Sequence, residues 1–214
     1  MDGQGGFDGG DLFQFVVAGG VLEQGAGQVI AAHYEDPPLF SSEVVPSTGQ
    51  GIRQAIGPIF ELMSRYLGPQ WSVGDWDGLS NAMKTALPPP LQLIGAAFGA
   101  GDAPPQNLKE YDPEWGRAFW SGTVGASCDH ERMLRSVKVR HVLLTHHFRV
   151  VDETSGTLMG ALADLQANRV MELLRGAGVH VEYRSFPTVG HSMHGTQPDL
   201  FVDTLLEWVR TLEL

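Results

Sequence analysis

The last third of the chain alternates two apolar strands with two amphipathic helices, and this order constrains the fold more than any other feature. Residues 138–145 and 179–186 read as buried strands, and a segment with apolar residues at helical spacing follows each of them. The final helix carries Phe201, Leu205 and Trp208 along one face. A strand–helix–strand–helix order is typical of a parallel sheet with helices on its faces. The sequence therefore predicts an α/β fold.

A third apolar run, at residues 28–34, ends at two prolines and reads as a further buried strand. We expect three regions in the chain. Residues 1–27 form a Gly-rich N-terminal segment, residues 28–36 and 130–214 form the α/β core, and residues 37–129 form an inserted helical region.

Charge and cysteine content exclude several classes of protein. The chain carries 14 Lys and Arg against 25 Asp and Glu, a net charge of −11, which argues against binding to nucleic acid or an anionic membrane. No apolar run reaches the length of about 18 residues that a membrane span needs. The single cysteine, Cys128, excludes an internal disulfide and favours a reducing, cytoplasmic compartment.

The chemically informative residues are those that follow the three predicted strands, because ligands of open α/β sheets bind beyond the carboxyl ends of the strands. These residues are Glu35, Asp36, His146, His147, Arg149, Asp152, His191 and His194. Acids and a histidine gathered at strand ends make an acid–base constellation that could activate a nucleophile.

Four segments resemble parts of the α/β-hydrolase superfamily. The tail GAGVHVEYRSFPTVGHSMH, with LLEWVRTL after it, resembles the last strand, Gly-His loop and last helix of such enzymes. The strand VRHVLLTH resembles the one whose loop often carries the triad acid, and AAHYEDPPLF resembles the strand that leads into the lid. The aromatic, proline-broken residues 37–129 resemble that lid. The resemblance covers residues 17–214 and implies an incomplete α/β-hydrolase-like parallel sheet with an inserted helical lid.

Carried onto this sequence, the resemblance implies that His191 is the general base. Asp152 fits the commoner placement of the orienting acid, after the penultimate strand, and is preferred. Glu35 fits a minority arrangement, found in lactonases that resemble the zearalenone-cleaving type. Asp36 and Glu153 are the remaining candidates for this acid.

The serine nucleophile of the family is missing from the sequence. No G-x-S-x-G motif is present, and the nearest counterpart, VVAGGVLEQ, puts Val17 at the nucleophile position. Valine has no hydroxyl and cannot act as the nucleophile. Too little chain precedes it to form the strands that normally come before the sharp strand-to-helix turn that carries the nucleophile. The sequence therefore predicts the C-terminal portion of a hydrolase of ester or lactone lineage that lacks its serine nucleophile.

Three interpretations remain open: a truncated gene product without independent activity, a non-catalytic small-molecule-binding pseudoenzyme, and a hydrolase with another nucleophile. The candidates for that other nucleophile are Ser41, Ser42, Ser121, Ser127 and Cys128. The alternative for each serine is a structural role, in which its hydroxyl caps a helix or stabilises a turn.

No metal or cofactor is expected. His146 and His147 share a strand end, but adjacent strand residues point to opposite faces, and no H-E-x-x-H motif or Cys pair accompanies them. The expected ligand is a small apolar ester or lactone. The strand at 28–34 lacks a predicted neighbour on one side, so we expect poor solubility, a homodimer through this sheet edge, or an edge rebuilt by residues 11–18.

Overall fold

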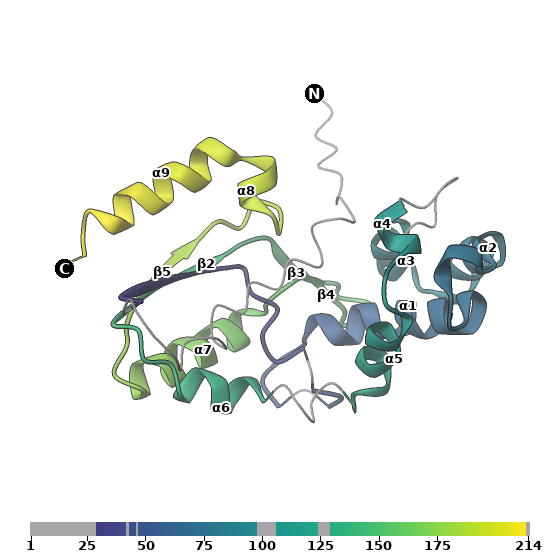
Figure 1. Cartoon of the computed structure of the whole chain (residues 1–214), viewed down its shortest axis with the longest axis horizontal. Coiled ribbons are helices and arrows are strands. Elements are labelled where there is room, and N and C mark those ends of the chain that lie inside the picture. The colour runs from purple at the N-terminus through teal and green to yellow at the C-terminus, as the bar shows by residue number, and fades with distance from the viewer. Residues whose placement is uncertain (1–28, 42, 46, 98–105, 124–128, 213–214) are drawn as a thin grey trace.

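The protein is a mixed α/β structure built on a three-stranded parallel sheet (Figure 1). The computed structural model describes residues 29–41, 43–45, 47–97, 106–123 and 129–212.

The sheet consists of β1 (Ala31–Glu35), β2 (His141–His146) and β5 (His180–Ser185), in the order β1–β2–β5. Its register pairs Ala31 with His141 and His141 with His180, so all three strands end at the same edge. The apolar run of the central strand β2 is fully buried, as expected for a strand that is covered on both faces. The predicted α/β fold is thereby confirmed, and each strand lies within three residues of its predicted bounds at both ends.

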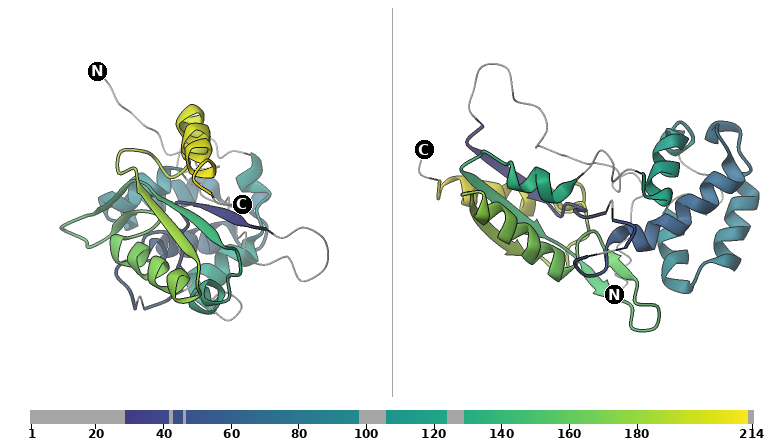
Figure 2. Two further views of the ribbon diagram at one scale, coloured as in Figure 1. Left: turned by 90° about the vertical axis from the view of Figure 1, so that its left-hand side faces the viewer. Right: turned by 90° about the horizontal axis from the view of Figure 1, so that it is seen from below.

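Helices cover both faces of the sheet (Figures 1 and 2). One face carries α6 (His130–Arg135) and α7 (Asp164–Gly176), and the other carries α8 (Met193–Thr196) and α9 (Pro198–Val209). The core between the sheet and α7 is made by aliphatic side chains from both elements, namely Val142, Leu144, Val181, Val170, Leu173 and Leu174.

The inserted region is helical, as predicted, and lies beyond one end of the sheet (Figure 2). Its elements are α1 (Ile52–Leu67), the 3₁₀ turn η2 (Trp71–Val73), α2 (Trp76–Ala86), α3 (Pro89–Ala97), α4 (Gln106–Lys109) and α5 (Pro113–Ser121). It has an apolar core of its own, in which the ring of Phe60 contacts the rings of Trp71, Trp115 and Phe119.

A short hairpin follows β2, where the sequence indicates only a loop. It pairs β3 (Arg149–Val151) with β4 (Leu158–Gly160) in antiparallel register. Its turn is closed by the Asp152 carboxylate, which accepts hydrogen bonds from the backbone and hydroxyl of Ser155. Strands this short give too few alternating positions to be recognised from the sequence.

Among the described residues β1 pairs with β2 alone, so its other side is an edge of the sheet. Residues 11–18, which could cover that edge, lie outside the described residues. None of the described helices combines the length and apolar character that a bilayer-spanning helix needs.

Candidate functional site

Two consecutive acidic residues lie at the carboxyl end of β1 and form the first part of the site. Glu35 is the last residue of the strand, and Asp36 continues the ladder by donating its backbone N–H to the carbonyl of Thr145 at 2.8 Å. Asp36 has a φ of 38°, the left-handed region that Asp tolerates better than most residues. This turn brings its carboxylate into the protein, where the residue is fully buried.

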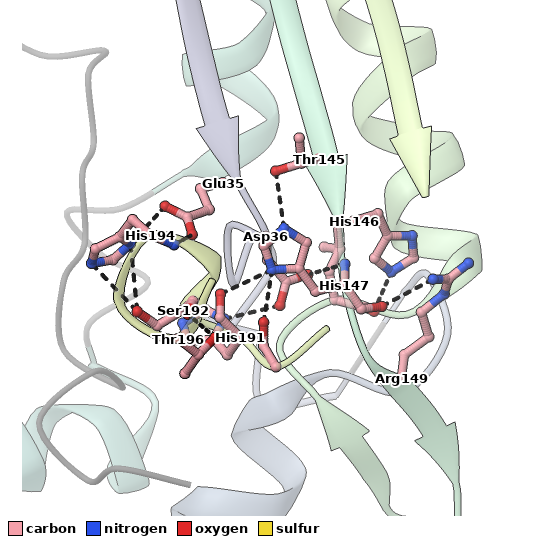
Figure 3. A network of polar contacts seen from close by, with 12 residues as sticks. Glu35, Asp36, Thr145, His146, His147, Arg149, His191, Ser192, His194 and Thr196 are labelled. Atoms are coloured by element: carbon pink, nitrogen blue, oxygen red, sulfur yellow. Dashed lines mark hydrogen bonds and ion pairs between the residues drawn. The ribbon is translucent and has the colours of Figure 1, made fainter. Parts of the chain in front are cut away.

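Asp36 and His191 form the most buried acid–histidine pair of the site (Figure 3). Oδ2 of Asp36 lies 2.9 Å from Nδ1 of His191, and Oδ1 accepts the backbone N–H of His147 at 3.1 Å. The side chain of Asp36 is 1% exposed and that of His191 is 16% exposed. Because a carboxylate only accepts, Nδ1 carries a proton, and in the neutral ring Nε2 keeps its lone pair. Nε2 makes no hydrogen bond within the described part of the chain.

Glu35 holds a second histidine beside the first pair. Its Oε1 accepts the backbone N–H of His194 at 3.0 Å, and its Oε2 lies 2.8 Å from Nδ1 of that ring. This pair is more open, with His194 36% and Glu35 19% exposed. The Ser192 hydroxyl lies 3.5 and 3.4 Å from the two ring nitrogens of His194. Such long and nearly equal distances do not align the hydroxyl with either lone pair, so this is not the contact of a nucleophile with its base.

The carboxylate that contacts His191 is therefore neither of the two preferred from the sequence. Asp152 lies in the β3–β4 turn, where the hydrogen bonds from Ser155 hold its pKa below the usual value. Glu35 is engaged by His194. Asp36, which the sequence analysis names only as a remaining candidate, takes this place because its positive φ breaks the alternation of side chains along the strand.

His147 lies at the centre of the same network and is fully buried. Its Nδ1 lies 2.9 Å from the carbonyl of Gly190 and 3.0 Å from that of His191. Its Nε2 lies 3.2 Å from the Thr145 hydroxyl, which in turn lies 3.0 Å from Nε2 of His33. Burial lowers the pKa of His33 to about 4, so this ring is neutral at physiological pH.

His146 and Arg149 brace the ends of the strands. His146 is fully buried, donates from Nε2 to the carbonyl of Leu162 at 2.7 Å and accepts the Tyr183 hydroxyl at Nδ1 at 2.9 Å. Burial lowers the pKa of His146, which keeps this ring neutral. Arg149 binds Asp164 at 2.8 Å and also donates to the backbone carbonyl of His147. These contacts assign both residues to the scaffold that supports the site.

Among the residues that the structure describes, none of the proposed nucleophiles contacts the pair of Asp36 and His191. Ser41 is buried, and the Ser121 hydroxyl is engaged at the end of α5 by the carbonyl of Ala118 and by Thr123. The other proposed positions, which are Val17, Ser42, Ser127 and Cys128, lie outside the described residues. In the part of the chain that the structure describes, no group of three or more His, Cys, Asp or Glu side chains is placed to hold a metal ion.

Comparison with known proteins adds no family to this picture. No protein-family model matches the chain, and no curated protein matches it either.

Proposed function

We propose that the protein is of carboxylic-ester or lactone hydrolase lineage, with an incomplete α/β-hydrolase-like sheet and residues 37–129 as its lid. The observation that carries the proposal is the 2.9 Å contact between Asp36 and Nδ1 of His191. An acid buried behind a partly exposed histidine is the base half of a catalytic triad. In it Asp36 orients the ring and His191 acts as the general base.

The position of the pair supports this function. Asp36 follows β1 and His191 follows β5, so both lie beyond the carboxyl ends of parallel strands, as Figure 3 shows. This is where open α/β sheets place their ligands. The order of strand, inserted helical region, strand, helix, strand and last helix also agrees with the α/β-hydrolase arrangement that the sequence resembles.

The chemistry follows from the state of the His191 ring. With its proton on Nδ1, the ring accepts a proton at Nε2 from the attacking group. No described hydroxyl contacts Nε2, so we take water as the nucleophile. Its oxygen attacks the carbonyl carbon as its proton moves to Nε2. When the tetrahedral intermediate collapses, the carbon–oxygen bond to the leaving group breaks and the imidazolium returns the proton to the alkoxide. The balance is ester plus water giving acid plus alcohol.

A small apolar ester or lactone fits the composition of the inserted region. Its core is rich in aromatic rings, and Trp76, Trp115 and Trp120 are only partly buried against that core. Partly exposed aromatic rings on a lid provide an apolar contact surface for a substrate.

A binding protein without turnover is the second candidate. It is favoured by one observation, the absence of a described hydroxyl at Nε2 of His191. Such a pseudoenzyme would bind the same ester or lactone class, and a ligand would then raise the melting temperature without being hydrolysed.

Turnover of p-nitrophenyl butyrate by the full chain separates these functions. We expect hydrolysis above the uncatalysed rate, a fall of about 10²- to 10⁴-fold in His191→Ala, and unchanged rates in the matched control Asp152→Asn. Equal turnover by the native chain and His191→Ala would reject His191 as the base. A saturable thermal shift without turnover would support the binding protein instead.

A further inference from the structure

We infer that His147 is a positioning residue that holds both members of the Asp36–His191 pair in their working geometry. This inference rests on the proposed function, since it assigns a task within the same site. The resemblance that implies His191 as the base gives His147 no role.

His147 touches the acid and the histidine by two separate routes (Figure 3). Its backbone N–H donates to Oδ1 of Asp36 at 3.1 Å, which leaves Oδ2 free for His191. Its ring donates from Nδ1 to the carbonyls of Gly190 and His191, at 2.9 and 3.0 Å. The two carbonyls belong to the peptide units on either side of the His191 Cα. Holding both therefore sets the direction in which the His191 side chain leaves the backbone.

The proton on Nδ1 of His147 follows from its partners. Carbonyl oxygens only accept hydrogen bonds, so the ring must donate from Nδ1, and in the neutral ring Nε2 is then the acceptor for the Thr145 hydroxyl at 3.2 Å. Having donated, the Thr145 oxygen accepts from Nε2 of the neutral His33 ring at 3.0 Å. Each group of this chain thus has one consistent role, which fixes the orientation of the His147 ring.

The backbone around His147 ties the same loop to the sheet. The N–H of Phe148 donates to the carbonyl of Val189 at 2.9 Å, and the N–H of Phe186 donates to that of His146 at 2.8 Å. The His147 ring also packs edge-on against Phe186. The segment that carries His191 is therefore held at both ends and at its middle. Without the Nδ1 donor, the two partly buried carbonyls would lose this partner, and the loop would be free to shift.

Two variants of His147 separate positioning from packing. The side-chain amide nitrogen of Asn lies as many bonds from Cα as Nδ1, so His147→Asn keeps a donor for the two carbonyls. The amide of Gln reaches the place of Nε2, so His147→Gln keeps a contact with Thr145 and loses that donor. We expect kcat for p-nitrophenyl butyrate to fall roughly 10- to 100-fold in His147→Gln, with KM within about threefold, because small misplacement of a reacting group costs this much. His147→Asn should stay within about fivefold of the native chain. Equal losses in the two variants, or no loss in His147→Gln, would overturn the inference.

Nuclear magnetic resonance of the native chain tests the inference without relying on turnover or on the folding of a variant. Long-range ¹H–¹⁵N spectra should show the His147 ring protonated at Nδ1, with a proton that exchanges slowly with solvent. A His147 ring protonated at Nε2 alone would overturn the inference. If the native chain shows this ring state but no hydrolysis, the proposed function fails while the positioning of His191 by His147 stands.

Discussion

The carboxylate of Asp36 contacts Nδ1 of His191 at 2.9 Å, although the two residues are 155 positions apart in the chain. They meet because β1 and β5 flank β2 in one parallel sheet, so the segments that follow them leave at the same edge. The left-handed backbone of Asp36 then turns its carboxylate toward the segment after β5. The pair is thus a product of sheet order and of one unusual backbone angle.

Replacing Asp36 by Asn should abolish most of the hydrolysis. Oδ1 of Asp36 accepts the backbone N–H of His147, so an Asn oxygen is expected there, which puts its NH₂ group toward His191. His191 would then carry its proton on Nε2 and could not act as a base. We expect kcat to fall about 10²- to 10⁴-fold, the range seen when an orienting carboxylate of this kind is removed. The rate of p-nitrophenyl butyrate hydrolysis measures this fall in kcat. Activity retained in the variant would show that Asp36 does not orient His191.

Removing the acid of the second pair should affect stability more than turnover. Glu35 accepts the backbone N–H and the ring Nδ1 of His194, and both side chains are partly exposed. Glu35→Gln should lower the free energy of unfolding by about 1 kcal/mol and leave kcat within about threefold. Urea unfolding and ester turnover report the two effects. A loss of turnover as large as that of His191→Ala would transfer the base to His194.

Acid should destabilise the fold through its buried histidines. Burial lowers the pKa of His33 from 6.5 to about 4 and also lowers those of His130 and His146. Below about pH 6.5 these histidines bind protons in the unfolded chain but stay neutral in the folded chain. The free energy of unfolding therefore falls as pH drops toward 4. His33 alone should account for about 2 kcal/mol of the loss between pH 7 and pH 5. Urea unfolding at the two pH values measures it.

His33→Gln is the matched variant for this pH dependence. Its amide can still donate to the Thr145 hydroxyl, as Nε2 of His33 does, but it does not titrate. The variant should therefore lose less stability on acidification than the native chain. Identical pH dependence in the two proteins would show that His33 contributes nothing to acid sensitivity.

The open side of β1 should lead to self-association. Among the described residues this strand pairs only with β2, and a bare strand edge is a template for pairing with a second chain. Light scattering during gel filtration should give twice the monomer mass at high protein concentration. Val29→Lys, which puts a charge on the half-exposed residue just before β1, should shift the mass toward the monomer. A native chain that stays monomeric at high concentration would contradict this edge as an interface.

The sheet and its site edge could be predicted from the sequence, whereas the pairing within the site could not. Apolar runs bounded by turns identify β1, β2 and β5, and the residues after them include both members of each acid–histidine pair. The choice between Glu35 and Asp36 depends on a single backbone angle, because an extended residue 36 would send the two carboxylates to opposite faces.

Asp152, the acid preferred from the sequence, lies in a turn with Ser155 for a related reason. The preference assumed that the segment after β2 leads an acid to His191, but this segment folds back as the hairpin of β3 and β4. The Asp152 carboxylate therefore accepts a hydrogen bond from Ser155 within the hairpin turn. The role of His147 was also beyond the sequence, since its contacts to the carbonyls of Gly190 and His191 come from a segment more than 40 residues away.

The ring state of His191 tests the central claim most directly. A long-range ¹H–¹⁵N spectrum of the native chain at neutral pH should show its proton on Nδ1, bonded to Asp36, with Nε2 unprotonated. In Asp36→Asn the proton should move to Nε2. A native His191 protonated at Nε2 alone, or a ring whose state is the same in Asp36→Asn, would contradict the assignment of this pair as an acid-oriented base.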